Sequence, residues 1–576
     1  MAAMTRPGDR HCIQPGCPLA VQVLAQSRSQ VSGLRQDARA AVSAAFNRRA
    51  FLQRIPLLAA GFLQAGQSNA GARPSRTERT LFNVRRFGAK GNGQTKDTRA
   101  VQRALDAAGR DGGCVYLPPG QYLCGTLRLR SHVTLQLENG ATLVAAPERG
   151  DFDDFEILGY NSFSDRETTD FNFALIRGRD LTNVAILGPG GIDMARKKRG
   201  GPKPIALKLC RNILVRDLTI ENAPNYNISL LGCDFVDIQG VTIRNGYADG
   251  IDPDCCRHVR IADCSVESWD DAIAAKASPS LGYLRPTEHL TVANCVLSTT
   301  CNALKLGTES SGGFKDILFQ NCSVFSDTSR WPGHRADSGL ALEMVDGADL
   351  ERVAVSNITM HDVCAPIFVR LGNRGRGQAK PLPRRLRDVS ISDIVATGAS
   401  WASSIMGVPG FPVEGLSLRN LRVTTRGGGK PELAARPVPE REAEYPDAGR
   451  FGDLPAYGLY CRHVDNLLLD AIHLAYEEPE SRPALVLDQV SNADLRMLLA
   501  KPPASGEPVA RFRNLRESFI QGCRALAGTK TWALLAGAQT ARVREAANDF
   551  TQALKSFELD ADVPPGALTT DSTVVR

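Results

Sequence analysis

Three stretches of eight residues repeat one pattern at a spacing of 23 residues: ILVRDLTI at 213–220, VDIQGVTI at 236–243 and VRIADCSV at 259–266. Apolar side chains or cysteine stand at the first, third, sixth and eighth positions, and aspartate or glycine stands at the fifth. Alternation with a period of two predicts a short strand, and a polar residue or glycine between two strands predicts a bend. Each stretch therefore predicts two short strands joined by a bend.

The pattern returns six more times along the chain. The first apolar residues of these further units are Leu290, Ile317, Val353, Val389, Leu416 and Leu467. A unit of this size cannot bury its own apolar edge, so neighbouring units must stack. Units in one register predict an all-β solenoid of parallel coils, filled by aligned Val, Ile, Leu and Cys side chains. A β-propeller or a leucine-rich horseshoe fits less well, because the blade-length period and the leucine-rich consensus are missing.

The two ends of such a stack need caps. Residues 97–109 (DTRAVQRALDAAG) carry apolar side chains at helical spacing, with Asp97 or Thr98 as the N-cap, so we expect a helix that closes the N-terminal end. The predicted division of the chain is a leader (1–72), an N-terminal cap region (73–131), the solenoid (132–500) and C-terminal coils with a cap (501–576).

Positive charge is concentrated at the start of the chain. The formal net charge is +7, but the first 72 residues hold eight arginines and two aspartates, so the rest carries 61 basic and 60 acidic side chains. This balance excludes a nucleic-acid footprint. Arg48-Arg49, a short apolar run (IPLLAAGFLQAG) and Ala70-Gly71-Ala72 predict a twin-arginine export signal. The run is too short for a membrane span, so we expect export to the periplasm or to the outside of a bacterial cell.

Five aspartates crowd into residues 247–276, although neighbouring carboxylates repel one another. The register of the repeat continues into a short segment of alternating residues that follows each unit in the sequence. It places Asp249, Asp271 and Asn302 side by side on successive coils. Because adjacent strands lie about 4.8 Å apart, we expect Asp249 and Asp271 to be neighbours, with Asp270 at the edge of the same cleft.

A second column of polar residues lies five positions farther along each coil. Its members are Asp254, Lys276, Glu343 and Arg370, and Lys305 lies between the two columns. The candidates for contact with a substrate are Asn302, Lys276, Lys305, Glu343 and Arg370.

The carboxylates of the first column suit acid/base chemistry. Cleavage of a glycosidic bond needs one protonated carboxyl and one ionised carboxylate, and close carboxylates push their pKa values apart. We therefore interpret Asp249, Asp270 and Asp271 as catalytic residues. Asp252 and Asp254 fit better with the turn chemistry of a coil corner.

These residues stand in motifs that resemble glycoside hydrolase family 28, the polygalacturonases and rhamnogalacturonan hydrolases. Tyr247-Ala248-Asp249-Gly250 resembles the family's N-T-D-G, and Trp269-Asp270-Asp271, followed by AIAAK, resembles its G-D-D. DGIDPDCCRHVRIADC is very similar to exo-acting bacterial members, and FNVRRFGAKGNGQTKDTRAVQRALDAAG also resembles the family. The likeness covers roughly residues 82–375. It implies a right-handed parallel β-helix and an inverting mechanism, with Asp270 as the general acid and Asp249 and Asp271 positioning the attacking water.

The sequence departs from the family in the next two motifs. Cys301-Asn302-Ala303 stands in place of G-H-G, and Ala341-Leu342-Glu343 stands in place of R-I-K, although LGTESSGG between them still fits. Arg370, one coil later, can restore a positive charge. The family's arginine and lysine are thought to hold the carboxylate of the substrate, so these changes affect galacturonate recognition more than hydrolysis. Glu343 is expected to make the cleft more acidic, which disfavours a polyanion.

The sequence thus predicts an exported, monomeric glycoside hydrolase that acts on a pectin-type or related polysaccharide or oligosaccharide, without a metal or organic cofactor. Thirteen cysteines follow residue 72, and none has zinc spacing. Two alternatives stay open: a polysaccharide lyase with Ca²⁺ held by Asp252, Asp254 or Asp271, and a carbohydrate-binding protein that has lost catalysis. Aromatic side chains of the long loop 430–463 either pack that loop or stack on sugar rings.

Overall fold

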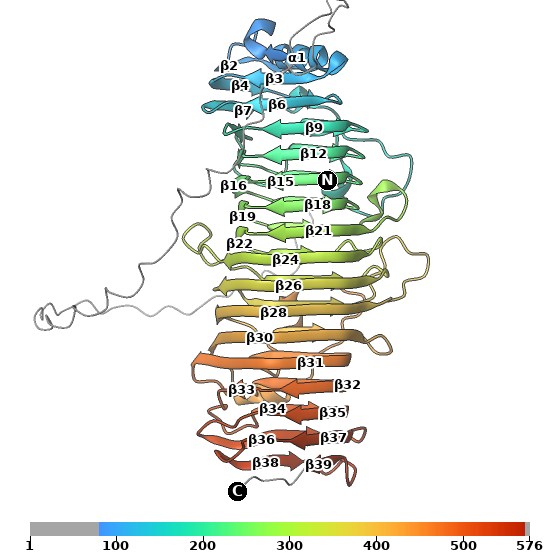
Figure 1. Ribbon diagram of the computed structural model, residues 1–576, viewed down its shortest axis with the longest axis vertical. Helices are drawn as coiled ribbons and strands as arrows, with labels where there is room; N and C mark the ends of the chain where they lie inside the picture. The colour runs from blue at the N-terminus through green and yellow to red at the C-terminus, as the bar shows by residue number, and fades with distance from the viewer. Residues whose placement is uncertain (1–79, 571–576) are drawn as a thin grey trace, which may run out of the picture. The chain divides into compact units, whose positions relative to one another are not determined.

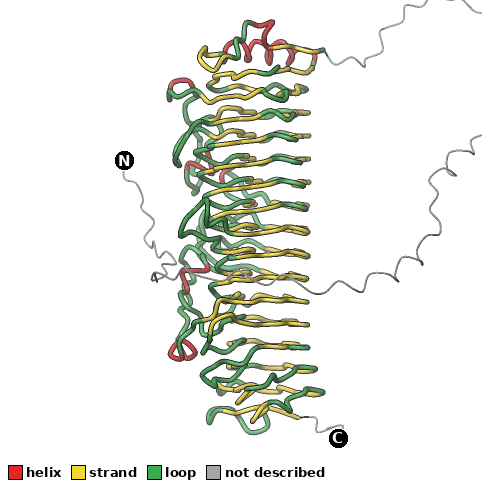
Figure 2. Tube along the Cα trace, turned by 90° about the vertical axis from the view of Figure 1, so that its left-hand side faces the viewer, coloured by secondary structure: helices red, strands yellow, loops and turns green. Residues whose placement is uncertain are grey.

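The computed structural model describes residues 80–570, so the predicted export signal lies outside the described residues. This part of the chain forms a long stack of coils, in which strands far apart in sequence lie one above another (Figure 1). Its 39 strands belong to one continuous network of pairing. Seen from the side, the loops and short helices gather along one side of the stack, and regular strands form the opposite side (Figure 2). The architecture is the predicted parallel β-helix.

The strands fall into three rows, and each coil contributes to every row along most of the stack. The first row consists of β5 (Leu127–Arg128), β8 (Ala174–Arg179), β11 (Lys203–Lys208), β14 (Ile228–Leu231), β17 (Ile251–Asp254), β20 (Ile273–Ala275), β23 (Asn302–Leu306), β25 (Ser338–Met344), β27 (Ala365–Leu371), β29 (Ser403–Met406), β31 (Leu459–Glu478), β32 (Leu485–Arg496), β34 (Ala510–Arg513), β36 (Thr529–Ala536) and β38 (Ala553–Leu559).

The second row lies on the next side of each coil. It consists of β1 (Leu81–Asn83), β3 (Gly113–Leu117), β6 (Val133–Leu137), β9 (Thr182–Leu187), β12 (Arg211–Arg216), β15 (Asp234–Gln239), β18 (Arg257–Ala262), β21 (Thr287–Ala293), β24 (Phe314–Phe325), β26 (Leu350–His361), β28 (Leu386–Ala399), β30 (Val413–Gly427), β31, β32, β35 (Arg516–Gln521), β37 (Ala541–Ala546) and β39 (Leu568–Thr570).

The third row is shorter. It consists of β2 (Asn92–Lys96), β4 (Gly120–Cys124), β7 (Ala141–Ala145), β10 (Gly191–Asp193), β13 (Thr219–Glu221), β16 (Thr242–Gly246), β19 (Ser265–Ser268), β22 (Val296–Thr299) and β33 (Leu499–Ala500). Between β22 and β33, the long strands of the second row continue into the third row.

The predicted register of the repeat is confirmed in the second row. Ile213 pairs with Val236, which is followed in turn by Val259, Leu290, Ile317, Val353, Val389, Leu416 and Leu467. Each of these nine side chains is at most 3% exposed. Burying one such aliphatic side chain stabilises a fold by about 1.5–3 kcal/mol, so this interior column holds the coils in register.

The fifth residue of each unit makes the predicted bend. These residues all adopt left-handed backbone angles, with φ between 50° and 62°: Asp217, Gly240, Asp263, Asn294, Asn321, Asn357, Asp393, Asn420 and Ala471. Glycine, asparagine and aspartate tolerate this conformation best. The side chains also stack, since Asn294 donates from Nδ2 to Asp263 Oδ1 at 3.1 Å. The fifth residue thus sets the turn, and asparagine and aspartate side chains at this position also join neighbouring coils.

The predicted helix at the N-terminal end is α1 (Thr98–Asp111), and it lies at one end of the stack (Figure 1). Its buried residues are Ala100, Val101, Ala104, Leu105 and Ala108. Asp97 is at the N-cap position, but its carboxylate accepts hydrogen bonds from the N–H groups of Lys90 and Gly91 instead of capping the helix.

Short helices mark the loops that leave the coils. They are α2 (Arg166–Thr169), η1 (Val84–Phe87), η2 (Arg149–Asp151), η3 (Pro279–Leu281), η4 (Pro431–Ala435) and η5 (Ala448–Phe451). Two loops matter for the site, because both enter the first row from the same edge: 146–173 leads into β8, and 194–202 leads into β11. Within residues 80–570, no helix is long and apolar enough to cross a membrane.

Cysteines form one column of the interior, in keeping with the aligned Val, Ile, Leu and Cys side chains that the repeat predicts. Cys264, Cys295 and Cys322 are buried and precede the paired residues Ser265, Val296 and Ser323 on successive coils. Twelve of the thirteen cysteines of the described residues are buried. They behave as small interior side chains, a common role for free cysteine.

Candidate active site

The three candidate catalytic aspartates lie at the edge where strands of the first row begin. Asp249 stands two residues before Ile251 and Asp271 stands two residues before Ile273, and these isoleucines pair between β17 and β20. The backbone N–H of Gly250 donates to the carbonyl of Asp271 at 2.9 Å. Asp249 and Asp271 therefore lie on adjacent coils, as the register of the repeat predicts.

Lys276 joins Asp249 to Asp252. Its Nζ lies 2.6 Å from Asp249 Oδ2, also pairs with Asp252 Oδ1, and sits 3.9 Å from the centre of the Tyr226 ring. None of the three charged side chains is more than 4% exposed. Burial raises the pKa of Asp249 well above its ordinary value; Lys276 opposes this shift and the nearby carboxylates add to it. The assignment of Asp252 to a turn is wrong, because its side chain belongs to this ionic cluster.

Asn302 and Lys305 hold Asp271. The backbone N–H and Nδ2 of Asn302 donate to Asp271 Oδ1 at 3.0 and 2.9 Å, and Lys305 Nζ donates to Oδ2 at 2.9 Å. All three residues are buried. The cations that the sequence assigns to substrate binding, Lys276 and Lys305, are thus engaged with carboxylates of the protein. They position these carboxylates and neutralise their charge.

Glu343 lies one coil beyond Lys305 and is fully buried. Its Oε2 is 3.5 Å from Lys305 Nζ, and neither carboxylate oxygen accepts a hydrogen bond from the described residues. Burial raises the pKa of Glu343 from 4.5 to about 8. The expectation that Glu343 makes the cleft surface more acidic is wrong, because the side chain does not reach solvent.

We predict that Glu343 makes the protein less stable as the pH rises. Between pH 4.5 and about 8 the folded protein keeps a proton that the unfolded chain releases, so the free energy of unfolding falls, by at most about 1.4 kcal/mol per pH unit. The contribution is complete below pH 4.5 and lost above about 8. Melting temperatures of the wild type and Glu343→Gln between pH 5 and 8.5 test this: the wild type should decline more steeply. Parallel curves would contradict the prediction.

Asp270 is reached by a cation from a distant loop. Arg199, in the 194–202 segment, pairs through NH1 with Asp270 Oδ2 and through NH2 with Glu167 Oε2 at 2.5 Å. Asp270 Oδ1 also accepts from the backbone N–H of Asp271 at 3.1 Å. The Arg199 side chain is 35% exposed, whereas the Asp270 side chain is 9% exposed. Oxygens of Asp270 and Asp271 and the Cys301 sulfur lie within 4.8 Å of one another.

Two members of the second column have other tasks. Asp254 accepts hydrogen bonds from the N–H of Ser278 at 2.8 Å and from its hydroxyl at 2.5 Å, which fits the expected turn chemistry. Arg370 donates to the backbone carbonyls of Gly407 and Glu440 at 2.9 and 2.5 Å and is 2% exposed. The expectation that Arg370 contacts a substrate is wrong, because its guanidinium fastens the 430–463 loop to the coils.

The aromatic residues of that loop pack inward for the most part. Phe451, Tyr457 and Tyr460 are at most 3% exposed. Tyr445 differs, because it is 42% exposed and its ring centre lies 5.9 Å from Lys305 Nζ. Tyr445 is therefore the aromatic residue of this loop that is available to a sugar ring beside the site.

Sequence reasoning missed three residues of the site. Lys203 and Tyr226 precede Asp249 in the same column, because Ile205 pairs with Ile228 and Ile228 with Ile251. Extending the register two coils backwards could have found both. Arg199 carries no such signal, because it projects from an irregular loop.

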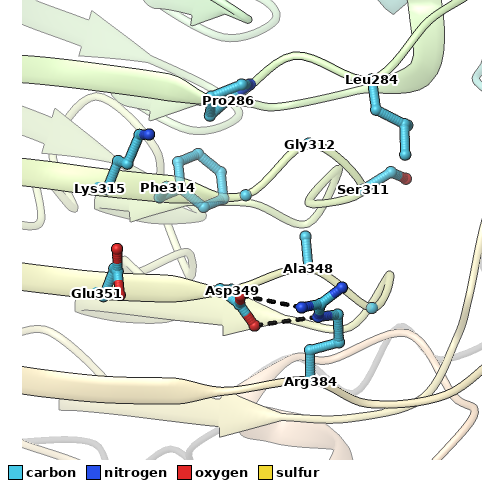
Figure 3. Close-up of a pocket in the computed structure, with 12 residues that line it drawn as sticks. Leu284, Pro286, Ser311, Gly312, Phe314, Lys315, Ala348, Asp349, Glu351 and Arg384 are labelled. Carbon is cyan, nitrogen blue, oxygen red and sulfur yellow. Dashed lines mark hydrogen bonds and ion pairs between the residues drawn. The ribbon is translucent and has the colours of Figure 1, made fainter.

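A separate pocket with a volume of about 340 Å³ lies at a corner of the coils, among residues that follow the first row. Figure 3 shows Asp349 paired with Arg384 among the lining residues, with Lys315 and Glu351 to one side. Lys315 is paired with Glu288, and Glu351 with Arg387. Its charges are thus satisfied by the protein itself, and none of the three catalytic candidates lines it.

Comparisons with known proteins identify relatives of this chain. A family model described as rhamnogalacturonase A/epimerase, pectate lyase-like, matches residues 81–324. A probable polygalacturonase of Vitis vinifera is 30% identical over 371 residues, which cover 58% of this chain and 73% of that protein. An exo-poly-alpha-D-galacturonosidase of Dickeya chrysanthemi is 24% identical over 397 residues, which cover 57% of this chain and 64% of that protein.

A solved structure shares the fold. The exopolygalacturonase of Thermotoga maritima superposes with a TM-score of 0.54 and 18% identity, covering 69% of this chain and 94% of that one. At this identity the match supports the β-helix architecture only. Because the Vitis relative is 30% identical and matched over nearly three quarters of its length, and because the aspartate motifs lie where the fold brings them together, the chain belongs to the polygalacturonase family of glycoside hydrolases, family 28.

Proposed function

We propose that this protein is an exported hydrolase of a pectin-type polysaccharide that uses Asp270 as general acid and Asp249 with Asp271 to position and activate water. One observation carries the proposal. Asp249 and Asp271 lie on adjacent coils, and each is paired with its own buried lysine. Asp270 lies beside them and is paired with an exposed arginine. Three carboxylates with three different environments can hold different protonation states, as acid/base chemistry requires.

The two lysines suit the role of the water-binding carboxylates. Lys276 favours the ionised form of Asp249, which is the form that can accept a proton from water, and Lys305 holds the carboxylate of Asp271 in place. At the same time burial raises the pKa of Asp249, which makes it a stronger base once it is ionised. Asn302 fixes the direction of the Asp271 carboxylate through two hydrogen bonds. This asparagine takes the place of the family's histidine.

The inverting outcome is proposed from the family resemblance. Oxygens of Asp270 and Asp271 approach within 4.8 Å, which is nearer to the spacing of about 5–5.5 Å in retaining pairs than to about 6.5–9.5 Å in inverting pairs. In this site Asp249 is a third carboxylate and can hold the water together with Asp271.

A calcium-dependent lyase is the rival that shares the fold. Its candidate ligands are bound to groups of the protein: Asp252 pairs with Lys276, Asp271 pairs with Lys305, and Asp254 accepts from Ser278. Lysine next to a carboxylate repels a divalent cation. This arrangement favours hydrolysis.

The experiment uses the purified protein on polygalacturonate, rhamnogalacturonan and neutral polysaccharides. We expect new reducing ends without absorbance of an unsaturated product and without dependence on Ca²⁺. An ultraviolet-absorbing product would identify a lyase. Binding to a polysaccharide without any release of reducing ends would identify a carbohydrate-binding protein.

Export is proposed from the sequence of residues 1–72 alone. A bacterial host that expresses the full chain should accumulate it outside the cytoplasm, and replacing Arg48 and Arg49 by lysine should keep it inside. Equal distribution of the two proteins would remove the twin-arginine assignment.

A further inference from the structure

Arg199 differs from the other cations of the site in its access to solvent. Its side chain is 35% exposed, whereas the side chains of Lys276 and Lys305 are 3% exposed. Lys197 and Lys198 beside it are also exposed. Among the cations of residues 80–570 that pair with the three catalytic candidates, Arg199 is the one that a dissolved substrate can reach.

The loop that carries Arg199 is fastened to the coils. The N–H of Gly200 donates to the carbonyl of Pro224 at 2.8 Å, and Asn225 Nδ2 donates to the carbonyl of Gly201 at 3.0 Å. A Cβ at Gly201 would lie 2.6 Å from a Pro224 side-chain carbon, so the loop lies close against the next coil. The backbone position of Arg199 is therefore fixed, and its long side chain supplies the movement.

The guanidinium already binds two carboxylates. Nε lies 3.1 and 3.2 Å from the two oxygens of Glu167, NH2 pairs with the same carboxylate, and NH1 pairs with Asp270. A guanidinium recognises a carboxylate by paired, parallel N–H donors. The carboxylate of an acidic sugar has the same geometry and charge as Asp270, so it can compete for NH1.

The pairing with Asp270 conflicts with the role of a general acid. An ion pair favours the ionised carboxylate, and an ionised carboxylate has no proton to give to a leaving oxygen. Asp270 must therefore lose Arg199 before it can act. When it does, it remains beside Asp249 and Asp271, whose negative charges favour uptake of a proton.

We infer that Arg199 is a specificity residue that exchanges Asp270 for the carboxylate of an acidic sugar, and that this exchange allows Asp270 to take up the proton it later donates. The inference rests on the proposed function. Asp270 takes its proton from solvent as Arg199 moves. The bond between the anomeric carbon and the leaving oxygen then breaks, that oxygen receives the proton of Asp270, and water bonds to the carbon while Asp249 accepts a proton from it. A neutral sugar cannot draw Arg199 away and so leaves Asp270 ionised.

The test compares trigalacturonate with its methyl ester as substrates. For the wild type we expect kcat/KM to be at least about tenfold higher on the acid, because the exchange adds a charge-assisted contact. Arg199→Met should lower kcat/KM on the acid by about 10- to 100-fold and leave it unchanged or higher on the ester, because Arg199 then no longer pairs with Asp270. Arg199→Lys should recover part of the preference. Glu167→Gln, which removes the other carboxylate partner, should keep the preference for the acid.

A loss of kcat/KM on the acid without a loss on the ester is the signature of the exchange. An equal loss of kcat/KM on acid and ester would make Arg199 a structural residue, and no loss on either would remove it from the site. Both results would overturn the inference. The proposed function would stand in both cases, because the wild type would still hydrolyse the substrate. If the wild type cleaves neither substrate, the polysaccharide assay decides the proposed function and calorimetry decides the inference. Weaker trigalacturonate binding by Arg199→Met, with the ester unaffected, would support it, and equal or absent binding would overturn it.

Discussion

Asp270→Asn is expected to lower kcat on the best polysaccharide substrate by about 10²- to 10⁴-fold, the usual contribution of a general acid. Asparagine has the size of aspartate and can still accept from the N–H of Asp271, which donates at 3.1 Å to the wild-type carboxylate. What it lacks is a transferable proton. Substrate binding should persist, so KM or the dissociation constant should change far less than kcat.

A matched control and a second substrate sharpen this prediction. Asp254→Asn changes another buried aspartate of the same sheet, one that holds Ser278 and no catalytic group, so it should leave kcat within a few fold of the wild type. A substrate with a leaving group that is stable as an anion needs little protonation, and on it the loss in Asp270→Asn should shrink. An undiminished kcat in Asp270→Asn, or an equal loss on both substrates, would contradict the acid assignment.

Lys276→Met is expected to give the largest loss of stability, about 3–5 kcal/mol, because removing one partner of a buried ion pair leaves an uncompensated charge. Here one ammonium serves two carboxylates, Asp249 and Asp252, and both residues are at most 3% exposed. Without it these groups must share protons. Asp249 would then be a poor acceptor for the proton of water, so kcat should also fall, by about 10²-fold or more. Chemical or thermal unfolding and initial rates measure the two effects.

Lys208→Met is the matched control for Lys276→Met. Lys208 stands three coils earlier in the same column and is paired with Glu156 at 2.7 Å, with 2% of its side chain exposed. Its loss should also destabilise the protein but should leave kcat unchanged. Adding Asp252→Asn to Lys276→Met removes one of the orphaned carboxylates and should restore part of the stability. A double variant no more stable than Lys276→Met would contradict the shared-cation account.

The fold could be predicted from the sequence because its determinants repeat. Interior residues such as Ile213 and Val236 alternate with a period of two, and a left-handed backbone conformation, usually at glycine, asparagine or aspartate, stands at every bend. A shift by one residue would turn the apolar side outward, so the pattern permits a single register. The same register placed Asp249 beside Asp271 without knowledge of any side-chain contact.

The partners of the aspartates could not be predicted in the same way. Register states which residues share a column, but a long side chain chooses among several neighbours. Glu343 and Arg370 pair in register, yet Glu343 lies near Lys305 and Arg370 binds carbonyls of Gly407 and of the 430–463 loop. Arg199 comes from a loop whose path no repeat determines. Burial and loop geometry, which decide these contacts, appear only in three dimensions.

The most direct test of the central claim is the anomeric configuration of the first product, followed by proton NMR immediately after mixing enzyme and substrate. If Asp270 protonates the leaving oxygen while Asp249 and Asp271 direct a water to the opposite face of the sugar, the new reducing end appears first with inverted configuration and only later equilibrates. A new reducing end that first appears with retained configuration would mean that a carboxylate attacks the sugar, and it would contradict the direct attack of a water positioned by Asp249 and Asp271.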